Sequence, residues 1–186
     1  LYKALIKSGF NKEAVLKEHC FFNGTFIDVI IHSKTNHTVN SKLFLRDASI
    51  NDAELLFEWV NEASVRFNSL NQELITYDNH VKWFQKRLTI SESKILIMML
   101  DNNAIGQVRI DFDESNWVID YSIDLNYRGK GYGKVIIDLL MKKFSQYNFI
   151  AKVKKQNIAS KKVFINLGFK EIDEIDNNLH SFQYKA

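Results

Sequence analysis

Apolar and polar residues alternate along several short stretches of the chain, the pattern of strands that bury one face of a sheet. The clearest case is 118–125, where Asp120, Ser122 and Asp124 interrupt apolar positions at every second residue. The polar run 101–103 separates two further apolar stretches and is typical of a hairpin turn. Strands are therefore expected over 43–46, 95–100, 104–112, 118–125, 149–153, 170–175 and 179–184.

Other stretches repeat apolar residues every three or four positions, which indicates amphipathic helices. The first covers 53–60, where Asp52 is in position to cap the helix. Residues 61–69 after it are predicted to form a loop. The other expected helices are 77–88, a stretch after residue 133 with apolar positions at 136, 139, 140 and 144, and a short stretch that Gly168 ends.

The first 36 residues hold a pattern that recurs near the end of the chain. Residues 1–10 can be laid over 160–169, because each is a short amphipathic helix that ends in Gly-Phe and precedes a charged strand. In the first copy, Asn23 and Gly24 stand between two strand-like runs, which predicts a β-hairpin.

Composition narrows the classes of protein. The chain has 186 residues, of which 46% are hydrophobic, enough for one globular core. The formal net charge is +3, so charge gives no reason to expect nucleic acid or an anionic membrane as a partner. No apolar run reaches the length of a membrane span and no signal-peptide pattern is present, so a cytoplasmic protein is the default. The single cysteine, Cys20, excludes a disulfide within the chain.

Three of the seven glycines fall at Gly129, Gly131 and Gly133, just before an expected helix. Glycine permits a tight turn and keeps side chains away from the backbone N–H groups, which at a helix start favour an anion. The spacing is that of neither the Walker loop nor the dinucleotide fingerprint G-x-G-x-x-G. With Arg128 and Lys130 beside it, the turn predicts a cradle for a pyrophosphate.

The pattern Arg-x-x-Gly-x-Gly from Arg128 to Gly133 resembles the acetyl-CoA loop of the GNAT superfamily of N-acetyltransferases. Asn157, Ser160 and the Leu-Gly-Phe of 167–169 resemble the second half of the same signature. The resemblance implies an α/β (α+β) fold with a mixed, mostly antiparallel, splayed central sheet flanked by helices. It also implies an acetyl-CoA-dependent N-acetyltransferase that needs no metal.

The superfamily pattern assigns the cofactor contacts. The strand before the glycine turn pairs with the pantetheine arm, the turn holds the pyrophosphate, and the following helix start faces the cofactor. Lys161 or Lys162 is available for the 3′-phosphate. The residues expected to bind acetyl-CoA are Tyr121, Ile123, Leu125, Arg128, Gly129, Lys130, Gly131, Tyr132, Gly133, Asn157 and Ser160.

The catalytic groups depart from the superfamily pattern. Val118 stands where many members have a glutamate base, and Phe164 where many have a tyrosine acid. Asp120 shares a strand face with position 118 and is the candidate base, although it could equally be a solvated carboxylate. His80 is the second candidate base, since histidine titrates near neutral pH. Water or another tyrosine would replace the missing acid.

Acceptor recognition is expected from the first half of the domain. Residues 43–170 resemble both the branch of ribosomal-protein N-terminal acetyltransferases and the enzymes that acetylate nucleotide-linked amino sugars in pseudaminic acid synthesis. By that resemblance Arg66 holds a diphosphate, Asn61 reads sugar hydroxyls and Trp83 stacks on a ring. A surface ion pair, a helix cap and a packed helix face are the structural alternatives. The favoured partner is thus a nucleotide-linked amino sugar.

Two other functions stay open: a peptide α-amine acceptor, and a catalytically silent module that binds acyl-CoA. Residues 1–36 resemble the C-terminal piece of a preceding GNAT module, 37–42 a linker, and 43–186 the acetyltransferase domain. We therefore expect a tandem module partner or a homodimer, the alternative being an N-terminal helix and hairpin that merely match the pattern.

Overall fold

The computed structural model describes residues 4–5, 8, 10–33, 42–172 and 178–186. The chain forms two compact units, Leu1–Ser41 and Lys42–Ala186, which are described separately. Within the described part of the chain, no helix combines the length and the apolar character that crossing a membrane requires.

The larger unit is built on one seven-stranded sheet with the strand order β3-β4-β5-β6-β7-β9-β8. All neighbouring strands are antiparallel except β6 and β7, which are parallel. The strands are β3 (Leu43–Asp47), β4 (Ser93–Leu100), β5 (Asn103–Asp113), β6 (Asn116–Ile123), β7 (Phe149–Lys154), β8 (Lys170–Ile172) and β9 (Leu179–Tyr184). This mixed, mostly antiparallel sheet confirms the predicted fold class.

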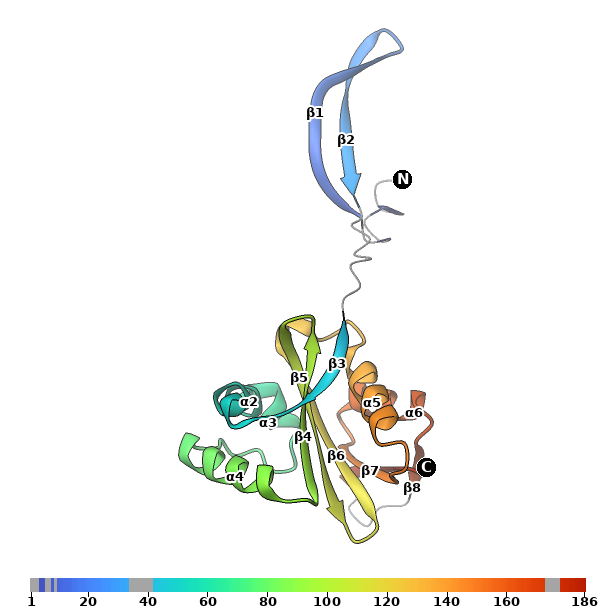
Figure 1. Ribbon diagram of the computed structural model, residues 1–186. Coiled ribbons are helices and arrows are strands. Elements are labelled where there is room, and N and C mark those ends of the chain that lie inside the picture. The colour runs from blue at the N-terminus through green and yellow to red at the C-terminus, as the bar shows by residue number, and fades with distance from the viewer. Residues whose placement is uncertain (1–3, 6–7, 9, 34–41, 173–177) are drawn as a thin grey trace. The chain divides into compact units, whose positions relative to one another are not determined.

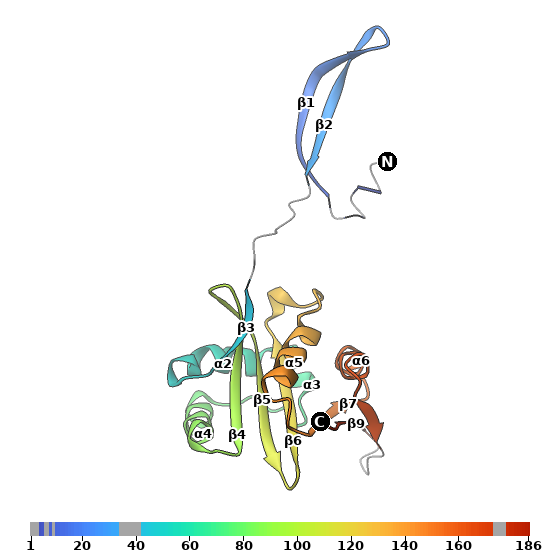
Figure 2. The same cartoon turned by 45° about the vertical axis from the view of Figure 1, so that its right-hand side comes forward.

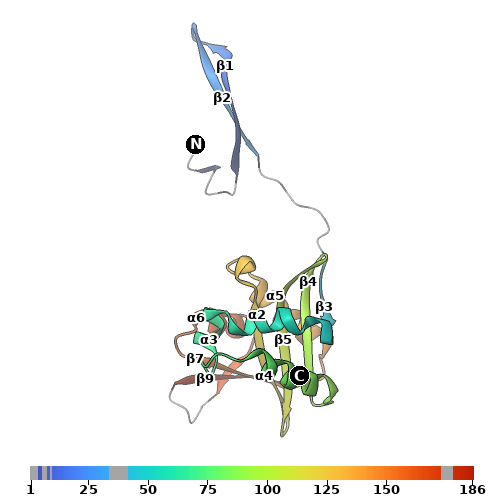
Figure 3. The same ribbon diagram turned by 90° about the vertical axis from the view of Figure 1, so that its left-hand side faces the viewer.

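Helices cover both faces of the sheet (Figure 1). One group lies over the face of β4 and β5, as Figure 3 shows in front view, and the other lies over β6 and β7 (Figure 2). The first group is η1 (Ile50–Asp52), α2 (Ala53–Asn61), α3 (Ala63–Asn68) and α4 (Tyr77–Thr89). The second is α5 (Tyr132–Lys143) and α6 (Ile158–Asn166), with η2 (Leu125–Tyr127) before α5.

Strand β4 is buried on both faces and divides the core into two clusters. Ile95 and Ile97 pack with α2 and α4, whereas Leu96 and Met98 pack with α5, β6 and β7. A strand buried on both sides reads as a continuous apolar run rather than an alternating one. The two clusters therefore give the domain an α2–α4 side and an α5–α6 side, separated by the sheet.

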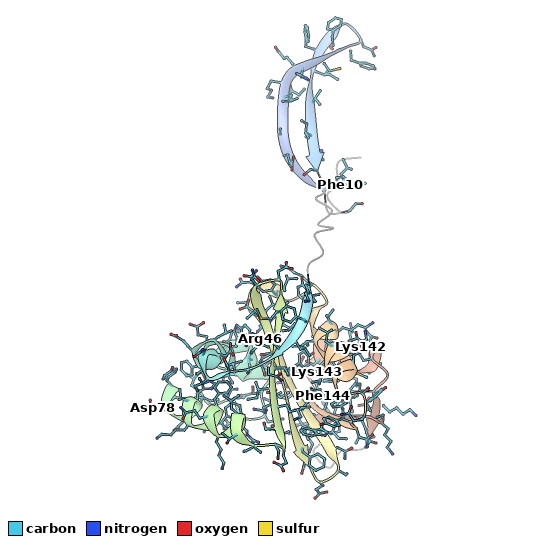
Figure 4. All side chains as sticks on the ribbon, viewed as in Figure 1. Phe10, Arg46, Asp78, Lys142, Lys143 and Phe144 are labelled. Atoms are coloured by element: carbon cyan, nitrogen blue, oxygen red, sulfur yellow. The ribbon has the colours of Figure 1, made fainter. Side chains whose placement is uncertain are left out.

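The predicted strand 118–125 ends earlier, at Ile123, and the other predicted elements recur with three differences. Residues 61–69 are not a loop throughout, because Glu62 caps α3 by accepting a hydrogen bond from Ser64 N at 3.0 Å. Asp52 precedes α2 but makes no side-chain cap to it. Its carboxylate instead accepts two hydrogen bonds from Arg46, at 2.6 and 2.8 Å, where β3 meets α2 (Figure 4).

The third difference concerns α5, which ends at Lys143, so the apolar Phe144 is its C-cap (Figure 4). The predicted role of Gly168 is confirmed in its backbone, which has φ +84° just after α6. Part of the predicted strand 170–175 lies outside the described residues, since β8 is described only to Ile172.

The smaller unit contains the predicted hairpin. Strands β1 (Asn11–Phe22) and β2 (Thr25–Ser33) are antiparallel and joined by Asn23 and Gly24, both with positive φ. Phe10 N donates to Leu5 O at 3.0 Å, the same bond that Phe169 N makes to Phe164 O at 3.1 Å after α6. Most of the predicted linker 37–42 lies outside the described residues, and the origin of residues 1–36 stays a prediction.

Candidate active site

The glycine turn between η2 and α5 has the backbone that only glycine adopts readily. Gly129 has φ +73° and Gly131 has φ +84°, and an added Cβ at either position would meet no atom within 4 Å. Glycine is thus required here by backbone conformation rather than by crowding. The open space beside both residues leaves room for a ligand against the main chain.

The N–H groups of this turn are available. No described residue accepts a hydrogen bond from the backbone N–H groups of Gly129 to Gly133. Helix α5 begins at Tyr132 with Gly131 as its N-cap residue, and no side chain caps its first N–H groups. Lys130 lies nearby, where its ammonium donates to Asn126 O at 3.0 Å. Free N–H donors at a helix N-terminus favour an anion, which is the role that the sequence predicts for this turn.

Strand β6 separates from β7 just before this turn. The ladder between them ends at Ile119 and Ala151, whereas β6 continues to Ile123. The predicted pantetheine contacts Tyr121 and Ile123 therefore lie beyond the last residue that pairs with β7, although both still pair with β5. Leu125, the third predicted contact, is 62% exposed in η2. The splayed sheet of the prediction is present, and its gap leads toward the glycine turn.

The two predicted contacts on α6 both have protein partners. Asn157 caps the helix, because its Oδ1 accepts from Ser160 N at 3.1 Å. Ser160 Oγ lies 3.1 Å from the Tyr121 hydroxyl. Burial raises the pKa of Tyr121, and the Ser160 hydrogen bond offsets only part of that effect, so this hydroxyl is a neutral phenol at physiological pH. Phe164, 2% exposed, packs its ring against Tyr121.

Arg128 points away from the turn. Its Nε donates to Ile123 O at 2.7 Å, its Nη1 to Ser64 Oγ, and its Nη2 to Glu62 Oε2 at 2.7 Å. Three donors of the guanidinium thus contact β6 and the start of α3. The sequence pattern predicts Arg128 as a pyrophosphate contact and does not indicate Glu62 as a functional residue.

A pocket on the α2–α4 side joins most of the residues predicted for catalysis and acceptor binding. Its volume is about 510 Å³ including the open mouth. Asn61 is the exception, because its amide exchanges two hydrogen bonds with the backbone of Ile75, at 2.8 and 2.9 Å. The lining residues are Leu56, Trp59, Val60, Val65, Arg66, Ser69, His80, Trp83, Ile95, Gln107, Arg109, Asp120, Tyr121 and Ser122.

Asp120 is the accessible carboxylate of this pocket. Its side chain is 57% exposed and lies 3.5 Å from Arg109, its cross-strand partner on β5. The same guanidinium contacts Asp111 at 2.9 Å and lies over the ring of Trp83, 5.1 Å from its centroid. Arg109 was missed from the sequence, although polar residues at 107, 109 and 111 alternate along β5.

His80 is 3% exposed, and its Nε2 lies 2.9 Å from Ala53 O. Because a carbonyl only accepts, Nε2 carries the proton, and Nδ1 is the only nitrogen left to act as a base. Burial lowers the pKa of His80, and the bond to Ala53 offsets part of that effect. The ring is therefore neutral at physiological pH and ties α4 to α2.

Arg66 combines internal bonds with one unused donor. Its Nη atoms donate to Asn71 O, Glu73 O and Ser69 Oγ at 3.1 to 3.3 Å. Its Nε is buried and has no hydrogen-bond partner among the described residues. Desolvation lowers the pKa of Arg66, and the charge of Asp120 opposes this effect. The unpaired Nε could donate a hydrogen bond to an oxygen of a substrate bound in the pocket.

A second cavity adjoins the first and shares Trp59, Val65 and Ser122 with it. Its wall carries three carboxylates and one guanidinium, which are those of Glu58, Glu62, Asp124 and Arg128. Across the described residues, no three His, Cys, Asp or Glu side chains are grouped so as to hold a metal ion.

Residues 42–170 match the acetyltransferase (GNAT) domain family. The chain is also 28% identical, over 143 residues, to an uncharacterised protein of Methanocaldococcus jannaschii. That alignment covers 71% of this chain but 29% of the relative, so the chain spans less than a third of the relative's length.

Solved structures share the fold at low identity. A domain from Methanocaldococcus jannaschii has a TM-score of 0.70 at 24% identity, over 78% of this chain and 99% of that one. The ribosomal L7/L12 α-N-protein acetyltransferase RimL, in complex with coenzyme A, has 0.67 at 19%, over 77% and 93%. The aminoglycoside acetyltransferase AAC(6′)-Ib, also with coenzyme A, has 0.67 at 15%, over 77% and 95%.

Proposed function

Because the chain belongs to the GNAT acetyltransferase family, a family of acetyl-CoA-dependent enzymes that act on amines, we propose that residues 42–186 acetylate a primary amine. The observation that carries the proposal is the row of N–H groups from Gly129 to Gly133 that no described residue pairs, together with the end of β6 that pairs with β5 but no longer with β7. The turn offers donors to the pyrophosphate, and the strand edge offers backbone groups to the pantetheine arm.

In the proposed reaction, the amine nitrogen attacks the thioester carbonyl, the carbon–sulfur bond breaks, and coenzyme A leaves as a thiolate. A backbone N–H of β6 stabilises the developing oxyanion. The amine loses one proton, which Asp120 accepts from the pocket side of the same strand. A positioned base of this kind contributes about 10²–10⁴-fold in rate. The thiolate takes its proton from water, since Phe164 has no hydroxyl.

The favoured acceptor is a nucleotide-linked amino sugar, of the kind used in surface glycan synthesis. Two observations support it: Arg66 and Arg109 both line the pocket, and Arg66 Nε has no hydrogen-bond partner in the part of the chain that the structure describes. A diphosphate would accept hydrogen bonds from such guanidinium groups. Trp83 supports the proposal less, because Arg109 and Arg87 already lie over its ring, 5.1 and 6.0 Å from the centroid.

A peptide α-amine is the second candidate, and the adjoining acidic cavity is the observation that favours it. Glu58, Glu62 and Asp124 would attract a cationic amine, which the basic groups of the first pocket would repel. RimL acts on a protein α-amine, whereas AAC(6′)-Ib acts on an aminoglycoside. Fold alone therefore does not select between the two acceptors.

We also propose that residues 1–36 correspond to the last helix and hairpin of another GNAT module. The matching bonds after Leu5 and after Phe164 support this correspondence. A chain reduced to residues 42–186 should then keep the acetyl-CoA affinity of the full chain within twofold in calorimetry. A loss of affinity beyond tenfold would assign the N-terminal unit to the acetyl-CoA site instead.

The function is tested in two steps. Acetyl-CoA should raise the melting temperature of the full chain by mass action. Coenzyme A release is then followed with a thiol reagent against a nucleotide-linked 4-amino sugar, a peptide with a free α-amine, spermidine and an aminoglycoside. Turnover with the sugar supports the favoured acceptor, and turnover with the peptide supports the second. Binding without any turnover would favour a silent acyl-CoA module, and absence of binding would refute the proposal.

A further inference from the structure

The side chain of Arg128 leaves the glycine turn and reaches α3, a helix of the opposite side of the domain. Its partners there are Ser64 Oγ and Glu62 Oε2, and the Glu62 contact is an ion pair of 2.7 Å. Both partners are more than 60 residues away in the sequence. The turn that is expected to hold the cofactor is thus tied directly to a helix that borders the acceptor pocket.

Glu62 holds α3 at the other end of this tie. Its carboxylate accepts from Ser64 N at 3.0 Å and from Ser64 Oγ at 2.7 Å, in addition to Arg128. Desolvation raises the pKa of Glu62, but the Ser64 bonds and the Arg128 pair outweigh it and lower the pKa to about 2. The carboxylate is therefore ionised at any physiological pH, and the tie is a permanent ion pair.

Helix α3 and the residue after it supply one wall of the acceptor pocket. Val65, Arg66 and Ser69 line that pocket, and Val65 also lines the adjoining cavity. The helix has six residues and none of them is buried, so apolar packing does little to fix its position. The contacts of Glu62 and Ser64 with Arg128 are therefore part of what holds this wall, together with the bond that Lys154 Nζ donates to Phe67 O at 3.0 Å.

We propose that Arg128 and Glu62 are positioning residues of the acceptor site, and that Arg128 is not the ligand of the pyrophosphate. The inference rests on the proposed function, because it assigns the pyrophosphate to the turn's backbone. That assignment needs no guanidinium: the N–H groups of Gly129 to Gly133 have no described acceptor, and Lys130 supplies positive charge beside them. Arg128 instead places Arg66 opposite Asp120.

A pyrophosphate role for Arg128 predicts changes in acetyl-CoA affinity that the positioning role does not. If Arg128 served the phosphates, Glu62 would compete with them for the same guanidinium. Glu62→Gln would then strengthen acetyl-CoA binding, while Arg128→Gln would weaken it. In the positioning role, both substitutions leave acetyl-CoA affinity nearly unchanged and loosen α3 to a similar extent.

The experiment compares the full chain with Glu62→Gln, Arg128→Gln, the double variant and Lys130→Gln. Acetyl-CoA affinity is measured by calorimetry, and the exchange of the backbone amides of residues 63–69 by hydrogen–deuterium exchange. We expect each single variant to keep the dissociation constant within threefold and to speed exchange in α3 about tenfold. The double variant should exchange no faster than either single variant, because both remove the same tie. Lys130→Gln should leave α3 exchange unchanged.

Kinetics with the panel amine that the wild type acetylates supply a second readout. The variants should raise the KM for that amine about tenfold while the KM for acetyl-CoA stays within threefold. A tenfold loss of acetyl-CoA affinity in Arg128→Gln, or a gain in Glu62→Gln, would overturn the proposal. If the wild type binds no acetyl-CoA, the proposed function fails, whereas the exchange data still test the tie between Arg128 and Glu62.

Discussion

The two sides of the sheet present different kinds of chemistry. On the α5–α6 side, the groups that face open space are backbone N–H groups of the glycine turn, which no described residue occupies. On the α2–α4 side, the polar groups are side chains, and most have a protein partner: Asn61 has Ile75 and His80 has Ala53. One side thus presents backbone donors without partners, and the other presents side chains of which most, but not Arg66 Nε, are hydrogen-bonded within the described part of the chain.

This difference decides what a sequence motif can reveal. Backbone donors are positioned by φ and ψ, so a glycine pattern at a helix start is enough to indicate them. Side-chain donors depend on partners distant in sequence, such as Glu62 for Arg128. We call the α5–α6 side, where the cofactor is proposed to bind, the cofactor side, and the α2–α4 side the acceptor side. Binding on the cofactor side should therefore respond to changes in backbone conformation, and binding on the acceptor side to changes in side-chain pairing.

The largest expected effect is on the acceptor side, at the carboxylate that is accessible in its pocket. Asp120→Asn removes the proposed base and should lower kcat about 100-fold, because a positioned base contributes at least that much. The acetyl-CoA dissociation constant should not change. Asp138→Asn, on the surface of α5 beside Lys142, is the matched control and should keep full activity. An Asp120→Asn variant with undiminished kcat would make Asp120 a solvated carboxylate and leave proton removal to water.

On the cofactor side, Gly131→Val should weaken acetyl-CoA binding about tenfold or more. The valine would have to adopt φ +84°, which costs about 1–2 kcal/mol for a residue with a Cβ and more for a β-branched one. Gly133→Ala is the matched control, because its Cβ would lie 3.4 Å from the Tyr121 ring, an ordinary contact. Calorimetry should show weaker acetyl-CoA binding for Gly131→Val than for Gly133→Ala. Equal acetyl-CoA affinities of the two variants would mean that the backbone of the turn does not contact the cofactor.

The difference between the two sides of the sheet also explains which features could be predicted from the sequence alone. Most strands and helices were predictable, because apolar period is a local property, whereas the mixed, splayed sheet with flanking helices was implied by the resemblance to the GNAT superfamily. The expectation of a GNAT fold is confirmed by the family match over 42–170 and by the shared fold of solved structures. The amino-sugar likeness has no such support and stays a prediction.

Acceptor-side roles were harder to predict, because they arise from contacts across the fold. Nothing near Arg66 in the sequence reveals that its Nη atoms bind the backbone of Asn71 and Glu73. Arg109 matters because β5 pairs it with Asp120, a pairing that depends on strand register. Short helix α3 was missed because its apolar positions are too few to show a period.

Arg66 gives a smaller effect that tests whether the acceptor side reads an anion. Arg66→Lys keeps the charge but loses the fork of donors, including the unpaired Nε. We expect the KM for a nucleotide-linked sugar to rise about fivefold, with a smaller change for a peptide amine. Equal changes for both acceptors would mean that Arg66 only holds residues 69–73 in place, and the diphosphate assignment would fail.

The smallest effect is on stability, at the ion pair that joins the two sides. Because the pKa of Glu62 is lowered to about 2 from an ordinary 4.5, its contribution to stability is present above pH 4.5 and is lost as the pH falls toward 2. At pH 7, Glu62→Gln should lower the free energy of unfolding by about 1 kcal/mol, since the pair is partly exposed. Denaturant titrations of both proteins from pH 7 to pH 2.5 should show this difference shrinking below pH 4.5.

The acid titration of Asp52, whose pKa the Arg46 pair also lowers, destabilises both proteins equally, so its effect cancels in the comparison. A difference that stayed constant with pH would mean that the Glu62 charge adds nothing to the hydrogen bonds that glutamine keeps, and the tie would then not be electrostatic.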